Sequence, residues 1–140
     1  MREIKIAKCV IRQNDSFLLQ LRDFEANKGA INLLGSFGGK IEEGETPIQA
    51  VVRELSEETN IVVDADELKE IGNLRVQSDK NNEEAIILST VFYLKLDDSF
   101  RVKSYDGKVI RINKDEINNS AIRMTPATKA AFEQLINNKD

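Results

Sequence analysis

The stretch GKIEEGETPIQAVVRELSEETNI, residues 39–61, constrains the fold of this chain most, because it joins a well-marked helix to a dense run of glutamates. Thr46 is a suitable N-cap, Pro47 fits the first helical position, and Gln49 stands where a capping box requires an amide or a carboxylate. Asn60 tolerates the left-handed backbone that often follows a helix, so we expect it to form the C-terminal cap. The pattern therefore predicts a helix between Thr46 and Asn60.

Two stripes run along this predicted helix. At about 100° of rotation per residue, Glu54, Glu57 and Glu58 fall within an arc of roughly 100°. The neighbouring arc is apolar and consists of Ile48, Val51, Val52 and Leu55. The apolar stripe predicts packing against a sheet, which would hold the acidic stripe in a fixed orientation.

The acidic stripe has more than one interpretation. Acidic helix faces are commonly solvated surface, and a purely structural cation site is another reading. Glutamates at these spacings repel one another by roughly a few tenths of a kcal/mol per pair, and a divalent cation relieves the repulsion. Mg²⁺ and Mn²⁺ prefer oxygen ligands and are often held by carboxylates together with substrate phosphates. Gly38 and Gly39, which lead into the stretch, allow the backbone to approach the same site closely.

These residues resemble the Nudix box, the signature of the Nudix hydrolase family, written G-x5-E-x7-R-E-U-x-E-E-x-G-U with U an apolar residue. The matching positions are Gly39, Glu45, Arg53, Glu54, Leu55, Glu57, Glu58 and Ile61. Asn60 stands at the position of the last glycine and departs from the pattern. The resemblance implies an α/β fold of the Nudix type, an α/β/α sandwich with a mixed β-sheet and a catalytic loop-helix-loop.

The resemblance also implies an activity, the hydrolysis of a nucleoside diphosphate linked to another moiety, with Mg²⁺ or Mn²⁺ as cofactor. Glu57 and Glu58 are the implied metal ligands. Glu54 is a further ligand or the base that takes the proton of the attacking water, and the carbonyl of Gly39 is an additional candidate ligand. Arg53 either touches phosphate or orients the glutamates as part of the catalytic group.

Other candidate site residues lie outside the acidic stripe. The resemblance favours a structural pair between Glu45 and Arg53. Arg22 and Lys40 are candidates for phosphate contact, with solvated surface as the alternative. Many members of the family use one more acidic residue from a distant loop, and the candidates here are Glu83, Glu84, Asp97, Asp98, Asp106 and Glu116.

The substrate stays open among several classes. The chain looks most like the group often called MutT-like, which acts on nucleoside triphosphates, including oxidised forms. ADP-ribose or a nucleotide sugar is the alternative, and a Nudix-fold domain that binds a nucleotide without turnover is an alternative of another class. The chain has no tryptophan, so stacking on a nucleobase has to use another aromatic residue, among Phe24, Phe37, Phe92, Tyr93, Phe100 and Tyr105.

Composition excludes several other kinds of protein. The chain has no histidine, which removes Ser-His-Asp and Cys-His nucleophile systems and imidazole bases. Its formal net charge of −4 argues against binding to duplex nucleic acid. No apolar run approaches the roughly 18 residues of a membrane span, and Cys9 suits a buried apolar position. We expect a single cytoplasmic domain over residues 1–140.

The remaining segments predict the rest of an α/β fold. Residues 3–12 and 16–22 are typical of a β-hairpin, and a polar loop follows over residues 23–30. Further strands are predicted over residues 67–77, 84–96 and 108–112, with an exposed loop over residues 78–84. Residues 125–138 predict a C-terminal helix whose buried side includes Ala127, Ala130, Ala131, Leu135 and Ile136. A homodimer that forms through the edge of the N-terminal strand is a further expectation.

Overall fold

The computed structural model describes residues 2–22, 33–80, 83–105 and 107–137. Within this part of the chain, seven strands form one sheet. They are β1 (Arg2–Gln13), β2 (Ser16–Arg22), β3 (Leu34–Gly35), β4 (Phe37–Lys40), β5 (Lys69–Lys80), β6 (Glu83–Leu96) and β7 (Gly107–Asn113). The helices of the described residues are α1 (Pro47–Glu58), α2 (Pro126–Asn137) and a short 3-10 helix, η2 (Ala65–Glu67). The predicted loop over residues 23–30, with Phe24, and also Asp106 lie outside the described residues.

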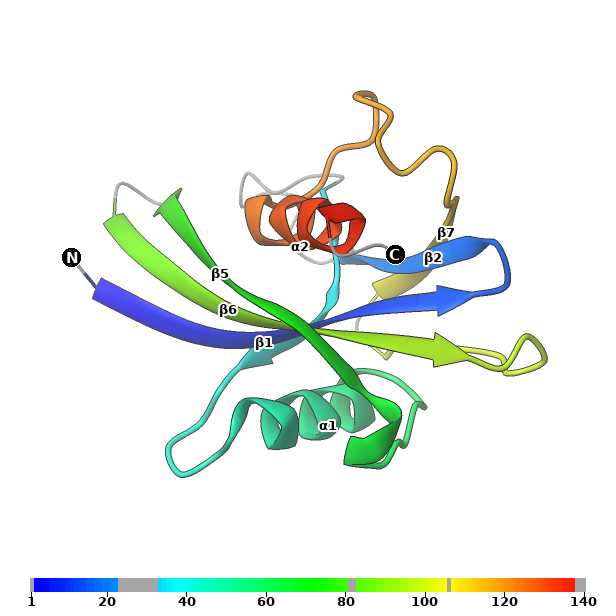
Figure 1. Cartoon of the computed structure of the whole chain (residues 1–140), viewed down its shortest axis with the longest axis horizontal. Coiled ribbons are helices and arrows are strands. Elements are labelled where there is room, and N and C mark those ends of the chain that lie inside the picture. Colours follow the sequence, from blue (N-terminus) through cyan, green and yellow to red (C-terminus); the bar gives the residue numbers. More distant parts are fainter. Residues whose placement is uncertain (1, 23–32, 81–82, 106, 138–140) are drawn as a thin grey trace.

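The sheet is mixed and lies between the two α-helices. Its strand order is β3-β2-β1-β6-β5, while β4 pairs with β1 and β7 pairs with β2. β1 runs parallel to β6 but antiparallel to β2 and β4. Figure 1 shows α1 on one side of the sheet and α2 on the other, which confirms the predicted α/β/α sandwich. Neither helix of the described residues is long and apolar enough to cross a membrane.

The predicted hairpin and its turn are present at the start of the chain. β1 and β2 pair antiparallel, with Gln13 opposite Ser16. Asn14 adopts a left-handed backbone with φ of 57°, which asparagine tolerates better than most residues. The turn residues between the two apolar runs therefore account for this part of the fold locally.

The first core lies between α1 and the sheet. Val51 and Leu55 of α1 are fully buried and pack in one cluster with Cys9 of β1 and Phe92 of β6. Burial raises the pKa of the Cys9 thiol well above its usual range, so this side chain stays a neutral apolar group. This result confirms the prediction for Cys9 and for the apolar stripe of the helix.

A second core lies between α2 and the opposite face of the sheet. Ala127 and Ala131 are buried as predicted, whereas Ile136 is 43% exposed and belongs to the surface. Phe132, which the helical pattern did not single out, is buried and packs edge-on against Phe17 with ring centroids 4.9 Å apart. Small alanines next to one large ring allow the helix to approach the sheet while the ring fills the remaining space.

The beginning of α1 agrees with the prediction, but its end does not. The Thr46 hydroxyl accepts from the N–H of Gln49, and the Gln49 side chain accepts from the N–H of Thr46 at 2.9 Å, which completes the capping box. The C-cap is Thr59 in an extended conformation with φ of −141°. Asn60 does not have a positive φ, because its backbone and side chain bond to residues 101–103 instead. The predicted left-handed cap at Asn60 is therefore wrong.

One prediction about the strands stays open and another needs correction. β1 pairs with β6 along its whole length, whereas β4 and β2 pair with its other side only between Ile6 and Gln13, so residues 2–5 have a register partner in β6 alone. A homodimer through the edge of this strand stays an untested prediction. The loop predicted over residues 78–84 is shorter in the structure, since β5 continues to Lys80 and β6 begins at Glu83.

We expect Gly38→Ala to lower the free energy of unfolding by about 3 kcal/mol or more, beyond ordinary backbone strain. The φ of Gly38 is +126°, and a Cβ atom there would lie 2.1 Å from the carbonyl oxygen of Ala7. Gly44→Ala is the matched control, because its φ is also positive but its surroundings are open. It should cost only about 1–2 kcal/mol. Urea denaturation measures the free energy of unfolding of both variants. An equal loss of unfolding free energy in the two would contradict the steric argument.

Candidate active site

The candidate site forms where β4 meets the C-terminal half of α1. Two glycines of β4 hold these elements together, and both pair with β1 in the sheet. The N–H of Gly38 donates to Oε1 of Glu58 over 3.1 Å. At Gly39, a Cβ atom would lie 2.8 Å from the carboxylate carbon of Glu54. The missing side chain of Gly39 therefore leaves the space that the Glu54 carboxylate occupies.

Glu58 is a buried carboxylate, with 7% of the residue exposed. Burial raises its pKa to about 7, while the Gly38 N–H and the positive charge of Lys8 act in the opposite direction. The neighbouring Glu54 carboxylate raises the pKa of Glu58 further. Negative charge at this position is thus poorly solvated, and a cation placed beside both carboxylates would stabilise it.

Arg53 links the loop before α1 to the acidic stripe. Its Nε and Nη2 donate to the two carboxylate oxygens of Glu45 at 2.6 and 3.0 Å, and Nη2 also donates to the carbonyl of Lys40. This two-pronged bond lowers the pKa of Glu45 and raises the pKa of Arg53. The structure therefore contains the Glu45–Arg53 pair that the box implies.

The same guanidinium also reaches the acidic stripe. Nη1 of Arg53 donates to Glu54 at 3.0 Å and to Glu57 at 3.1 Å. The Glu54 side chain is 16% exposed and the Glu57 side chain 58% exposed, so the stripe runs from the interior to solvent. Part of the repulsion that the sequence implied is relieved by Arg53. Glu58 accepts from the N–H of Gly38 in β4 instead.

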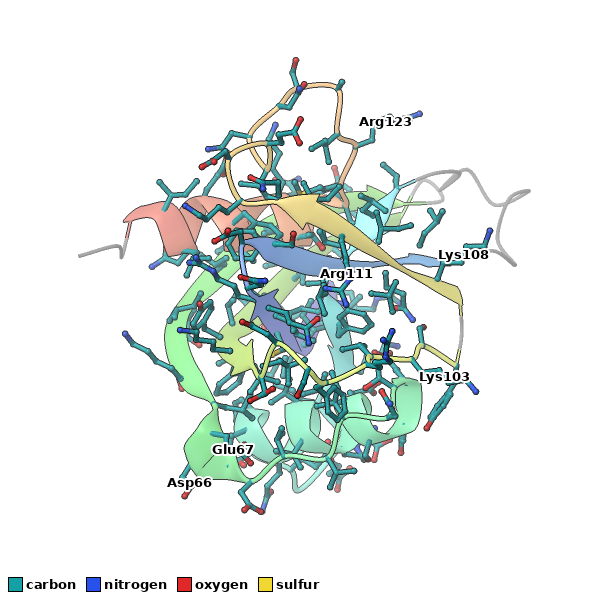
Figure 2. The ribbon with its side chains drawn as sticks, turned by 90° about the vertical axis from the view of Figure 1, so that its right-hand side faces the viewer. Asp66, Glu67, Lys103, Lys108, Arg111 and Arg123 are labelled. Atoms are coloured by element: carbon teal, nitrogen blue, oxygen red, sulfur yellow. The ribbon has the colours of Figure 1, made fainter. Side chains whose placement is uncertain are left out.

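A tighter acidic group lies at η2. Among the described residues, ligand atoms of Asp64, Asp66 and Glu67 lie within 4.8 Å of one another, so this group could hold a cation. All three residues are exposed, and Glu67 accepts from the N–H of Asp64 at 2.9 Å as part of a capping box. Figure 2 shows Asp66 and Glu67 toward one end of α1 and Lys103 toward the other. The capping box explains why Asp64 and Glu67 lie together without an ion, whereas Asp66 takes no part in it.

Sequence reasoning missed Lys8 as a member of the site. From β1, its Nζ donates to the carbonyl oxygens of Ser36 at 3.1 Å and Gly38 at 3.4 Å, and its charge acts on Glu58. A signal was present, because Lys8 interrupts the apolar run IAKCVI. A partly buried lysine needs polar partners, but a single sequence does not say which atoms supply them.

The remaining predicted candidates are not brought to the site by a described contact. Lys40 is exposed and contributes its carbonyl to Arg53, and the Arg22 side chain lies outside the described residues. Asp97 accepts from the N–H and hydroxyl of Ser99, which lowers the pKa of Asp97 and marks a local turn. Of the other acidic candidates, Glu84, Asp98 and Glu116 are exposed, and the side chains of Glu83 and Asp106 are not described. A distal acidic ligand stays a prediction.

Comparison with known proteins identifies the family of the chain. The model of the NUDIX domain matches residues 3–133, so the chain belongs to the NUDIX domain family. The chain is 47% identical over 62 residues to the 8-oxo-dGTP diphosphatase of Escherichia coli (strain K12), a match that covers 44% of this chain. The same match spans 46% of that relative, which is about half of its length.

Solved structures share the fold at low sequence identity. The MutT protein of Methanosarcina mazei Go1 aligns with a TM-score of 0.76 at 19% identity. This alignment covers 99% of this chain and 97% of the MutT chain. A bifunctional NMN adenylyltransferase/ADP ribose pyrophosphatase from Francisella tularensis has a TM-score of 0.71 at 22% identity. This alignment covers 97% of this chain and 41% of the Francisella tularensis chain. Proteins with these different names carry one fold, so the fold alone does not select a substrate.

We expect Glu58→Gln to stabilise the metal-free protein above neutral pH. The folded-state pKa of Glu58, about 7, lies above the ordinary value of 4.5, so its ionisation opposes folding. The unfolding free energy of the original chain should therefore fall relative to the variant as the pH rises from about 4.5 to about 7. A shift of this size corresponds to roughly 3 kcal/mol. Glutamine keeps an oxygen for the Gly38 N–H.

The measurement is urea denaturation in EDTA at pH 5 and pH 8. Glu57→Gln is the matched control, because it removes the same charge from a side chain that is 58% exposed. Between pH 5 and pH 8, the unfolding free energy of Glu57→Gln should change by as much as that of the original chain. A Glu58→Gln variant with the same pH dependence as the original chain would show that burial of this carboxylate opposes folding only weakly.

Proposed function

We propose that this chain is a divalent-cation-dependent hydrolase of nucleoside diphosphate derivatives. The observation that carries the proposal is the position of Glu58, a buried carboxylate that β4 orients next to a second carboxylate, Glu54. Such a pair is unfavourable without a cation. Membership of the NUDIX domain family supports the same reading.

The residues of the site fit a bound Mg²⁺ or Mn²⁺. The donor set consists of oxygen atoms, which both ions prefer. Glu54, Glu57 and Glu58 would hold the ion, and the carbonyl of Gly39 is a further donor. Glu57 reaches into solvent, where a phosphate-bearing substrate can share the cation. The acidic group at η2 is less suitable, because all three of its residues are exposed and Asp64 and Glu67 already form the capping box.

When bound, the cation supplies charge neutralisation for the diphosphate and a water of lowered pKa. The chain itself supplies orientation. Arg53 holds Glu45 with two bonds and Glu54 and Glu57 with a third nitrogen, so the acidic stripe keeps one arrangement as substrate enters. Lys8 and the Gly38 N–H fix the region around Glu58. We propose that Arg53 acts in this way, as a positioning residue within the catalytic group, while Glu54 serves as a ligand or as the base.

For the substrate, we propose a nucleoside triphosphate, including oxidised forms. Water attacks phosphorus, one phosphoanhydride bond breaks, and the products are a nucleoside monophosphate and pyrophosphate. Support comes from the 47% identity over 62 residues to a protein named 8-oxo-dGTP diphosphatase. ADP-ribose or a nucleotide sugar is the second candidate. The fold does not decide between the two, since a protein named in part ADP ribose pyrophosphatase shares it with a TM-score of 0.71.

We expect Glu57→Gln and Glu58→Gln each to lower turnover by at least about 100-fold, since even loss of an outer partner of a metal ligand costs about 10- to 100-fold. Each variant should stay folded, because each removes repulsion together with a ligand. The assay is a panel of nucleoside triphosphates with oxidised guanine forms, ADP-ribose, nucleotide sugars and dinucleoside polyphosphates, with Mg²⁺ or Mn²⁺.

Ser56→Ala is the control for this panel. Ser56 is exposed on the same helix, and its hydroxyl donates to the carbonyl of Arg53, away from the carboxylates. It should keep turnover within a factor of about two. Unchanged turnover in both glutamate variants would overturn the site, and nucleotide binding without any turnover would favour a sensor domain.

We expect Gly39→Ala to reduce turnover through Glu54 while it leaves the fold intact. The added Cβ would lie 2.8 Å from the Glu54 carboxylate, the far end of a side chain that can move aside. A double-mutant cycle with Glu54→Gln measures this coupling. The loss caused by Gly39→Ala should largely disappear when Glu54 is already replaced. Additive losses would mean that Gly39 acts independently, for example through its carbonyl.

A further inference from the structure

Residues 100–105 lie within the connection between β6 and β7 and run beside the end of α1. The N–H of Tyr105 donates to the carbonyl of Glu58 over 2.8 Å, and Thr59 forms an antiparallel bridge with Ser104. The N–H of Asn60 donates to the carbonyl of Lys103 over 3.2 Å. This segment is therefore attached to the turn of α1 that carries the buried carboxylate of the site.

The Asn60 side chain strengthens this attachment. Its Nδ2 donates to the carbonyl of Arg101 at 2.9 Å, and its Oδ1 accepts from the N–H of Lys103 at 2.8 Å. The glycine that the box has at this position could make neither bond. From the other side, the buried Gln20 of β2 donates to the hydroxyl of Ser104 at 3.0 Å. Two carboxamides, one from the end of α1 and one from β2, thus hold the segment.

Tyr105 is an exposed aromatic residue whose backbone is bonded to the last turn of α1. The residue is 57% exposed, and its backbone N–H donates to the backbone carbonyl of Glu58. The other described candidates for base stacking are packed inside. Phe37 and Phe92 are fully buried, while Phe100 and Tyr93 are partly buried and packed against the two cores.

Positive charge accompanies this ring. Arg101 and Lys103 are exposed on the same segment, and Figure 2 shows Lys103 and Lys108 on one side of the molecule. Exposed cations beside an acidic metal site attract a polyphosphate and leave an aromatic face available to the base. Stacking on such a face tolerates different bases, because every base has a π-face.

We propose that Tyr105 stacks on the base of the bound nucleotide and that Asn60 is a positioning residue that fixes residues 100–105 for this contact. The inference rests on the proposed function, since it assigns the base end of the same site. It predicts that affinity for the base and affinity for the phosphates can be separated by mutation.

Intrinsic fluorescence provides a direct test, because the chain has two tyrosines and no tryptophan. Nucleoside monophosphate with Mg²⁺ should change the emission of the original chain, after correction for nucleotide absorbance. In Tyr105→Phe the remaining tyrosine is the partly buried Tyr93, so most of the change should vanish while the phenyl ring still supports binding.

Calorimetry then measures affinity in the matched variants. Tyr105→Ala should weaken nucleoside monophosphate binding by about 5- to 100-fold, and Tyr105→Phe should restore most of it. Magnesium pyrophosphate, which lacks a base, should bind Tyr105→Ala and the original chain alike. Val62→Ala is the control, because Val62 is 85% exposed and belongs to no part of the site.

Asn60→Gly tests the positioning role. It restores the residue of the box and removes two bonds to residues 101–103, so it should weaken nucleotide binding but not pyrophosphate binding. With a hydrolysed substrate, Tyr105→Ala and Asn60→Gly should raise KM and leave kcat within about threefold, as expected for a lost binding contact. If Asn60 had a purely structural role, Asn60→Gly would bind nucleotide and pyrophosphate more weakly to the same extent. That result would overturn the positioning role.

The outcomes separate this inference from the proposed function. Normal turnover with a Tyr105→Ala affinity within twofold of the original chain overturns the stacking role alone. Base-dependent binding that is lost in Tyr105→Ala, in a chain that hydrolyses no member of the panel, supports stacking and overturns the hydrolase. A chain that binds neither nucleotide nor pyrophosphate with Mg²⁺ overturns both proposals.

Discussion

The burial of one carboxylate at the joint between a strand and a helix is the constraint on which the rest of this site depends. Glu58 can occupy that position because Gly38 offers its N–H, and Gly38 can do so because its backbone has a conformation that only glycine adopts easily. Burial makes the negative charge of Glu58 unfavourable and raises its pKa to about 7. In the proposed function, the same arrangement that weakens the metal-free fold would favour a bound cation.

Arg53 and Lys8 place positive charge around the acidic residues without neutralising them completely. Arg53 holds the loop before α1 through Glu45 and also bonds Glu54 and Glu57 through a third nitrogen. Lys8 acts from the sheet, where its amino group is fixed by backbone carbonyls. Much of the site is therefore arranged before a ligand arrives, which reduces the reorganisation that binding requires.

How much could be predicted depended on how local the interaction was. The capping box between Thr46 and Gln49 spans a single turn, and the helix starts where the pattern placed it. The cap at Asn60 was predicted from local preference, but contacts with residues 101–103 determine its conformation. Phe132 was missed for a similar reason, because its burial depends on a contact with Phe17 across the core. Long-range partners are what a single sequence does not specify.

The sequence by itself determined the apolar and acidic stripes of α1, the glycines before it and the hairpin at the start of the chain, because each follows from periodicity or backbone preference over a few residues. Its box spacing also indicated the family to which the chain belongs. Only the tertiary structure decided that Lys8 lies beside Glu58, that β1 is an interior strand, and that Tyr105 is exposed next to the acidic helix. These features depend on which distant segments become neighbours, and that outcome is set by the packing of the whole sheet rather than by any one segment.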